Sequence, residues 1–288
     1  MIFPSAPQTA ADVGGHYDEL DDTYRAIWGE HVHHGLWRTG AESPREATEA
    51  LVELVAGRLA LAPGQKVVDI GCGYGASAAQ LAERHRVAVT GLTISAAQAR
   101  IAETRGNITC FERDWLDNGL EGAAFDRAYA IESSEHMVDK ARFFAEAFRV
   151  LKPGGRLVVC AWLAKSAPGR FEIRHLLEPI CREGRLPSMG SREEYEALAH
   201  GAGFAPRGFE DVSREVRRTW SICARRVALK LLTDGSFRRL ALSRNTKNRS
   251  FLLSLPRLML ALRSGAMRYG VFTWEKPSVS ASSAWSGR

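Results

Sequence analysis

The stretch 67-VVDIGCGYG-75 decides the fold, because it puts an acid and three glycines on alternate positions directly after an apolar run. These residues are Asp69, Gly71, Gly73 and Gly75. The spacing differs from the G-x-G-x-x-G dinucleotide fingerprint and from the P-loop. Glycine lets the backbone approach a ligand closely. A carboxylate beside the loop repels phosphate but attracts an ammonium or sulfonium group, so we expect a positively charged ligand. A tight strand–helix turn that holds no ligand is the alternative.

Apolar strands and amphipathic helices alternate on both sides of this stretch. A helix over 44–59 precedes it, with Ser43 as the N-cap and Glu46 completing a capping box. Further helices are expected over 76–84, 96–104, 140–151 and 192–200. Strands are expected over 66–70, 86–92, 107–112, 124–131, 155–162, 206–212 and 269–274. This order predicts an α/β, doubly wound, mostly parallel sheet, in which ligands bind beyond the carboxyl ends of the strands.

The composition is that of an ordinary globular protein, with 288 residues, 45% apolar and 25% charged. No apolar run reaches the roughly 18–20 residues that a membrane span needs. The N-terminal segment lacks the basic and apolar regions of a secretory signal. The five cysteines are widely spaced, which suits reduced thiols rather than a zinc or iron–sulfur site. We therefore expect a cytoplasmic protein.

The net charge of +6 hides a strong asymmetry along the chain. Residues 214–249 contain eleven Lys or Arg and only two acids, Glu215 and Asp234. Such a segment can bind nucleic acid, rest on an anionic membrane surface or form a solvated helix face. Its basic residues are interleaved with aliphatic ones, and no RNA-binding motif occurs, so we expect no nucleic-acid partner.

Several segments resemble the motifs of class I S-adenosylmethionine-dependent methyltransferases. They include the glycine stretch, ERDWLD at 112–117 and RVLKPGGRLVV at 149–159. The segments IWGEHVHHGLW at 27–37, VTGLTISAAQ at 89–98 and ESSEHMVDK at 132–140 are similar to the γ-tocopherol methyltransferase and sterol 24-C-methyltransferase group. The resemblance implies S-adenosyl-L-methionine as cofactor and a Rossmann-like, seven-stranded, mostly parallel sheet with a helical N-terminal lid and a C-terminal cap.

Four regions follow from the pattern and the resemblance together. Residues 1–42 would form an N-terminal arm and lid, and 43–163 the cofactor-binding core. Residues 164–277 would supply an insertion, irregular over 164–190, then a helical substrate cap and the last strands. The tail 278–288 and the first dozen residues are expected to be disordered.

The resemblance also implies which residues lie at the cofactor. The glycine stretch would hold the methionine and ribose, and the residues after the second strand would flank the ribose. Asp114 would accept a hydrogen bond from the adenine amine and Trp115 would pack on its ring; a solvated acid and a core aromatic are the alternatives. The aromatic face of Tyr17 could favour the sulfonium. The full set is Tyr17, Asp69, Gly71, Cys72, Gly73, Thr93, Ile94, Gln98, Asp114, Trp115, Leu116 and Ile131.

Two acids and an imidazole follow the fourth expected strand. Because histidine titrates near neutral pH, His136 is the first candidate for a catalytic base. Glu132 would orient it or touch the cofactor, and His34 would lie near the acceptor. A structural His136 and a helix-capping Glu132 are the alternative. His31, His33 and His34 lack a carboxylate or cysteine that would complete a metal site, so no metal is expected.

These features predict methyl transfer to carbon or a heteroatom of a small, largely apolar acceptor, such as an isoprenoid quinol or chromanol, a sterol or a natural-product ring. The basic C-terminal region would form one wall of the acceptor pocket and could rest on an anionic membrane. An ordinary packed cap is the alternative for that region. For the whole chain, the alternatives are a nucleic-acid methyltransferase and a non-catalytic S-adenosylmethionine-binding protein.

Overall fold

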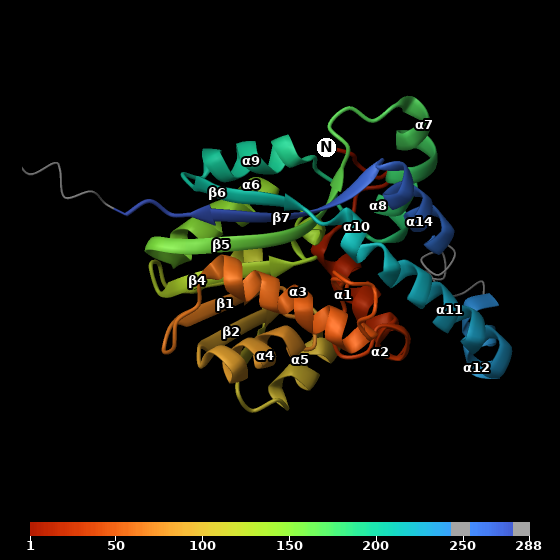
Figure 1. Cartoon of the computed structure of the whole chain (residues 1–288), viewed down its shortest axis with the longest axis horizontal. Helices are drawn as coiled ribbons and strands as arrows, with labels where there is room; N and C mark the ends of the chain where they lie inside the picture. The colour runs from red at the N-terminus through yellow and green to blue at the C-terminus, as the bar shows by residue number, and fades with distance from the viewer. Residues whose placement is uncertain (243–253, 279–288) are drawn as a thin grey trace, which may run out of the picture.

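The computed structural model describes residues 1–242 and 254–278. Within them, seven strands form one sheet in the order β3-β2-β1-β4-β5-β7-β6 (Figure 1). Strands β3, β2, β1, β4 and β5 run parallel, and β7 lies antiparallel between β5 and β6. The predicted sheet is thereby confirmed. The strands are β1 (Lys66–Ile70), β2 (Ala88–Thr93), β3 (Thr109–Glu112), β4 (Phe125–Ile131), β5 (Leu151–Ala164), β6 (Ala205–Asp211) and β7 (Met267–Glu275).

Helices cover both faces of the sheet (Figure 1). On one face lie α3 (Pro44–Leu59), α4 (Ala76–His85) and α5 (Ala96–Glu103). On the other lie α6 (Lys140–Val150) and α9 (Arg192–Gly201). The apolar stripe of each helix packs on a sheet that is buried on both sides, so the inner strands read as continuous apolar runs.

A second group of helices gathers beyond the carboxyl ends of the parallel strands (Figure 1). Five of these helices share one apolar cluster that includes Ile27, Ile180, Trp220 and Leu258. The cap they form therefore stands over the strand ends, where the glycine loop lies. Its helices are α1 (Ala10–Glu19), α2 (Asp21–Ile27), α7 (Arg170–Glu172), α8 (Glu178–Glu183), α10 (Ser213–Val216), α11 (Arg218–Thr233), α12 (Gly235–Leu242) and α14 (Leu255–Ser264).

Two sequence predictions about order are wrong. The segment 164–190 is largely helical, because Leu176, Leu177 and Ile180 place a buried face on a π-helical turn (Ile173–Leu177) and α8. The N-terminal residues are also ordered, since Ile2 pairs with Met189 through two backbone hydrogen bonds of 2.8 Å. Nearly all of the tail expected to be disordered, residues 279–288, lies outside the described residues.

Candidate active site

The loop after β1 depends on a missing side chain at Gly71. Its φ is +84°, in the left-handed region that favours glycine. A Cβ at this position would lie 2.4 Å from the Cβ of Ser133, in the turn after β4. The ends of β1 and β4 therefore approach each other with backbone alone on the β1 side.

Asp69 is buried at the end of β1, with 3% of its surface exposed. Its carboxylate accepts a 2.6 Å hydrogen bond from the Tyr129 hydroxyl. Burial raises the pKa of the Asp69 carboxyl to about 7, and the Tyr129 hydrogen bond opposes that rise. A hollow of about 340 Å³ borders Asp69, Gly71, Cys72 and Gly73. A cationic group entering this hollow would meet a carboxylate and bare backbone.

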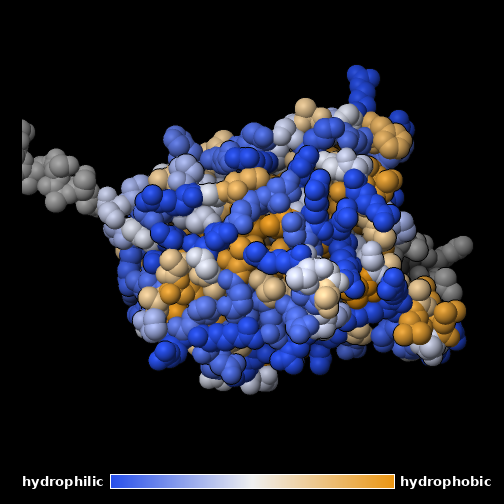
Figure 2. All heavy atoms as spheres, viewed as in Figure 1, coloured by the Kyte–Doolittle hydropathy of each residue, from blue (hydrophilic) through white to orange (hydrophobic). Residues whose placement is uncertain are grey.

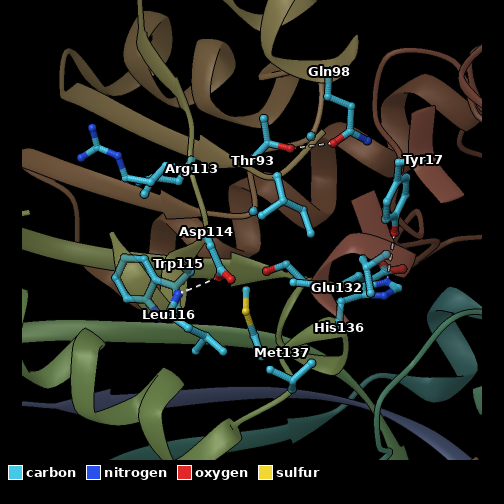
Figure 3. A pocket seen from close by; sticks show the side chains of 18 of the residues that line it. Tyr17, Thr93, Gln98, Arg113, Asp114, Trp115, Leu116, Glu132, His136 and Met137 are labelled. Carbon is cyan, nitrogen blue, oxygen red and sulfur yellow. Dashed lines mark hydrogen bonds between the residues drawn. The ribbon is translucent and has the colours of Figure 1, made fainter. Parts of the chain in front are cut away.

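A larger pocket of about 760 Å³ lies beside this hollow (Figure 3). Of the fifteen residues that the sequence placed in the site, Asp69 and Cys72 border only the smaller hollow, and His34 borders neither space. The other twelve line the larger pocket: Tyr17, Gly71, Gly73, Thr93, Ile94, Gln98, Asp114, Trp115, Leu116, Ile131, Glu132 and His136.

Two local hydrogen bonds orient polar groups along this pocket (Figure 3). The Thr93 hydroxyl donates to Oε1 of Gln98 at 2.9 Å. The backbone N–H of Leu116 donates to Oδ1 of Asp114 at 2.8 Å. Each bond fixes a short polar side chain after a strand, which suits groups that recognise hydroxyls and amines.

The ring of Trp115 packs in the apolar core, although the residue also borders the larger pocket. Its Nε1–H donates to the carbonyl of Phe143 at 3.2 Å, and the side chain is 2% exposed. The expectation that this ring packs on adenine is therefore not supported. The core alternative describes it better, because an indole with a buried hydrogen-bond partner is held in place.

Sequence reasoning missed several residues that line the larger pocket. Ala10 and Val13 come from α1, whose beginning was expected to be disordered. A signal was present, since Thr9 and Asp12 form a capping box at the start of this helix. The remaining missed residues lie within the segments quoted above as similar to methyltransferase motifs, and that similarity was the signal that could have found them: Val32, Leu92, Arg113, Ser133, Met137 and Val138.

A second pocket of about 460 Å³ adjoins the first beneath the cap. The two pockets share Tyr17, Val32, Glu132 and His136. Its lining contains Glu135 and five aromatic residues, which are Tyr17, Tyr24, Trp28, Trp162 and Trp220. An apolar ring held in this pocket would therefore face the first pocket across Glu132 and His136.

Glu132 is the centre of the hydrogen bonding between the two pockets. Its Oε1 accepts from the His34 backbone N–H at 2.7 Å and from the Tyr269 hydroxyl at 2.8 Å. Its Oε2 pairs with the His34 ring at 2.9 Å and accepts from the Trp162 indole at 3.1 Å. Burial alone would raise the pKa of Glu132, but the His34 charge and hydrogen bonds outweigh it and lower the pKa to about 2. The carboxylate is therefore ionised and its oxygens are fully engaged.

His34 lies behind the second pocket and does not border it. Its ring is 1% exposed and packs edge-on against Trp162 and Trp220 and tilted against Tyr269, with centroids 5.0–5.6 Å apart. His34 borders neither pocket, and the expectation that it lies near the acceptor stays a prediction. Its contacts make it the partner that holds Glu132.

His136 lies at the junction of the two pockets. Its Nε2 is 3.0 Å from the Tyr17 hydroxyl, and its Nδ1 is 3.4 Å from the carbonyl of Arg185 (Figure 3). Burial, followed by the charge of His16, lowers the pKa of His136 to about 3. Burial also raises the pKa of Tyr17. At neutral pH the pair is therefore a neutral imidazole and a neutral phenol.

Glu135 and Lys140 stabilise the turn that carries His136. The Glu135 carboxylate accepts from the Trp162 backbone N–H at 2.5 Å, and burial raises its pKa to about 7. The buried Lys140 ammonium donates to the carbonyls of Glu135 and Met137 and to the Ser188 hydroxyl. These bonds use all three donors of the ammonium and tie the turn to the segment after α8.

Comparison with known proteins identifies the family. The family model for mycolic acid cyclopropane synthetases matches residues 5–221. A 27-O-demethylrifamycin SV methyltransferase of Amycolatopsis mediterranei is 35% identical over 226 residues, 76% of this chain and 82% of that protein. The chain belongs to this family of S-adenosylmethionine-dependent methyltransferases.

Other relatives of the methyltransferase agree with this assignment. The chloroplastic tocopherol O-methyltransferase of Arabidopsis thaliana is 28% identical over 290 residues, 91% of this chain and 80% of that protein. The cyclopropane synthase MmaA2 of Mycobacterium tuberculosis has the same fold, with a TM-score of 0.82 at 23% identity over 94% of this chain and 100% of that one. The predicted family, enzyme class and cofactor are confirmed, and the enzyme acts on small molecules.

The residues of the methyltransferase fit S-adenosylmethionine. A hollow with a buried carboxylate and a side-chain-free loop suits a charged amino acid end, and a neighbouring pocket with oriented polar groups suits a nucleoside. A Cβ at Gly71 would intrude between the two strand ends that border both spaces. In the methyltransferase, Asp69 and the glycine loop would hold the first part, and Thr93, Gln98 and Asp114 the second.

Gly71→Ala tests the steric requirement of the loop. The new methyl group would clash with Ser133 and sit at a positive φ, which costs about 1–2 kcal/mol for an L-residue. We expect affinity for S-adenosylhomocysteine, measured by calorimetry, to fall by at least about tenfold, which is about 1.4 kcal/mol. Gly57→Ala in α3 is the matched control, because a Cβ at that position would meet no other atom within 4 Å. Unchanged affinity in Gly71→Ala would contradict the assigned geometry.

Proposed function

We propose that the methyltransferase transfers a methyl group to a hydroxyl of a small, largely apolar acceptor that carries a flat ring. The observation that carries the proposal is the adjoining of two pockets that share Tyr17, Val32, Glu132 and His136. One pocket has the oriented polar groups of a nucleoside site, and the other is walled by aromatic rings. A methyl donor in the first and an acceptor in the second would meet at His136.

The walls of the second pocket favour an aromatic or polyunsaturated acceptor. Indole and phenol rings pack flat rings by edge and offset contacts that add to the area they bury. The rifamycin and tocopherol relatives are named for O-methylation. The aromatic walls support an apolar framework, and the names of these relatives support a hydroxyl on it in preference to an amine or a carbon.

We assign His136 as the group that takes the proton of the acceptor hydroxyl. Bound S-adenosylmethionine supplies a methyl group on a sulfonium that needs no further activation. The protein must align the hydroxyl, exclude water and accept a proton. Because burial keeps His136 neutral, its Nε2 lone pair is available once the Tyr17 hydroxyl yields to the acceptor. The ionised Glu132 would stabilise the charge that His136 gains.

Glu132 and His34 act as positioning residues in this proposal. The four hydrogen bonds to the Glu132 carboxylate leave it no free role as a base. Its φ of +54° shows a backbone held in a conformation that L-residues rarely adopt. This turn would place His136 at the mouth of both pockets.

We also propose that the outer face of the cap rests on an anionic lipid surface. Leu229 and Leu232 on α11 and Leu260 on α14 are exposed, and Arg225 and Arg263 are exposed on the same helices. Figure 2 shows apolar surface at the end of the molecule formed by α11 and α12. None of the helices within the described residues is long and apolar enough to cross a bilayer. A basic, apolar face of this kind suits contact with a surface.

The proposed function is tested with methyl-labelled S-adenosylmethionine, a panel of phenols and a lipid extract of the source organism, followed by mass spectrometry. We expect label in a methyl ether of an apolar ring compound. Label on carbon or nitrogen would overturn the hydroxyl assignment. In a parallel incubation that also contains RNA, label on the RNA alone would overturn the acceptor class.

Presenting the same panel in vesicles tests the cap: turnover should rise on anionic vesicles, and salt should remove the gain. Equal turnover on neutral vesicles would contradict the surface proposal.

With an acceptor in hand, His136→Asn separates proton transfer from binding. We expect kcat to fall by about 10²–10⁴-fold, the usual contribution of general base catalysis, with S-adenosylhomocysteine affinity within about twofold. Because the pKa of His136 is about 3, its protonation should not limit wild-type turnover between pH 6 and 8. His200→Asn, at an exposed position in α9, is the control. Wild-type turnover in His136→Asn would remove it as the base.

A further inference from the structure

Two of the five cysteines face each other beside the glycine loop. The Sγ atoms of Cys72 and Cys110 are 3.6 Å apart, and both thiols are free and buried. Cys72 lies between the glycines of the loop, and Cys110 lies on β3. Neither thiol takes part in the proposed methyl transfer.

Gly91 on β2 makes this contact possible. Strand β2 lies between β1 and β3, and Gly91 pairs with Cys110 in the sheet register. A Cβ at Gly91 would lie 2.7 Å from Sγ of Cys72. The Cys72 thiol therefore occupies the space that a side chain of β2 would fill, and it reaches β3 across the intervening strand.

Cys72, unlike Cys110, borders the hollow that also contains Asp69, Gly71 and Gly73. A ligand in that hollow would therefore lie against Cys72. The hydrogen bond between the two thiols lowers the pKa of Cys110, whereas the same bond and burial raise the pKa of Cys72, so Cys110 is the thiol of the pair that favours a thiolate.

We propose that Cys72 and Cys110 form a disulfide when a hydroperoxide enters the cofactor-free hollow, and that this bond weakens cofactor binding. One thiolate attacks the peroxide, forming a sulfenic acid and releasing water or an alcohol after proton uptake. The thiol of the second cysteine then attacks the sulfenic sulfur, forming the S–S bond, and its proton leaves with the sulfenic hydroxyl as water. Two thiols lose two electrons, and the peroxide O–O bond is reduced.

The consequence for the cofactor follows from the geometry of the loop. A disulfide requires about 2.0 Å between sulfurs, so the two atoms must close by about 1.6 Å. Cys72 would move toward β3 and carry Gly71 and Gly73 with it. Because these glycines line both cofactor spaces, the shift would change their shape. The inference depends on the cofactor site and not on His136 or the acceptor.

The test treats the cofactor-free enzyme with hydrogen peroxide, with and without saturating S-adenosylhomocysteine. Non-reducing peptide mass spectrometry follows the Cys72–Cys110 cross-link, and calorimetry follows S-adenosylhomocysteine affinity. We expect the cross-linked peptide, a loss of affinity of at least tenfold, recovery with dithiothreitol, and slower cross-linking when the ligand is present.

Two variants make the result specific. Cys110→Ser should resist the loss of affinity, whereas Cys223→Ser, at a buried cysteine of the cap, should behave as wild type. A cross-link that leaves affinity unchanged would overturn the proposal, as would oxidation without a Cys72–Cys110 peptide. If Cys110→Ser does not fold, the ligand arm decides alone, since equal cross-linking rates with and without S-adenosylhomocysteine would contradict access through the hollow.

Discussion

The close approach of two strand ends, without a side chain between them, is the constraint on which the site depends. Gly71 follows β1 and Ser133 follows β4, and these strands are neighbours in the sheet. The contact places the cofactor loop directly beside the turn that carries Glu132 and His136. A parallel sheet brings such carboxyl ends to one edge, and glycine lets them meet. Backbone packing thereby fixes the separation between the glycine loop and the turn that carries the proposed base.

The buried carboxylate of Glu132 then assembles the rest of the site around that contact. An ionised carboxylate removed from water costs several kcal/mol unless its oxygens are satisfied. Here the four donors come from the N-terminal segment, β5 and β7, so the acid is satisfied only when these parts are together. Hydrogen bonds to a charged group contribute about 1.5–3 kcal/mol each. Assembly of the lid over the sheet and ionisation of Glu132 are therefore coupled.

Local pattern predicted the sheet, and the resemblance of short motifs to a family predicted most of the residues that line the larger pocket, because both depend on short-range signals. The glycine spacing, the capping boxes and the alternation of strands and helices are each encoded within a few residues. The orientation of Trp115 was not predictable in this way, because it depends on Phe143, which is distant in the sequence. The sequence placed His34 near the acceptor. It could not show that three aromatic rings from other segments enclose the His34 side chain. The order of the N-terminal arm likewise depends on pairing with Met189.

The central claim is that a carboxylate at the end of β1 holds a positively charged group of the cofactor, and the pH dependence of ligand affinity tests it most directly. The pKa of Asp69 in the free protein is about 7, so the carboxyl is largely protonated at pH 6 and ionised at pH 8. Only the ionised form attracts an ammonium group. Calorimetry should show wild-type affinity for S-adenosylhomocysteine rising from pH 6 to pH 8, and a weaker affinity without that rise in Asp69→Asn. The same rise in both proteins, or equal affinities at pH 8, would contradict the account.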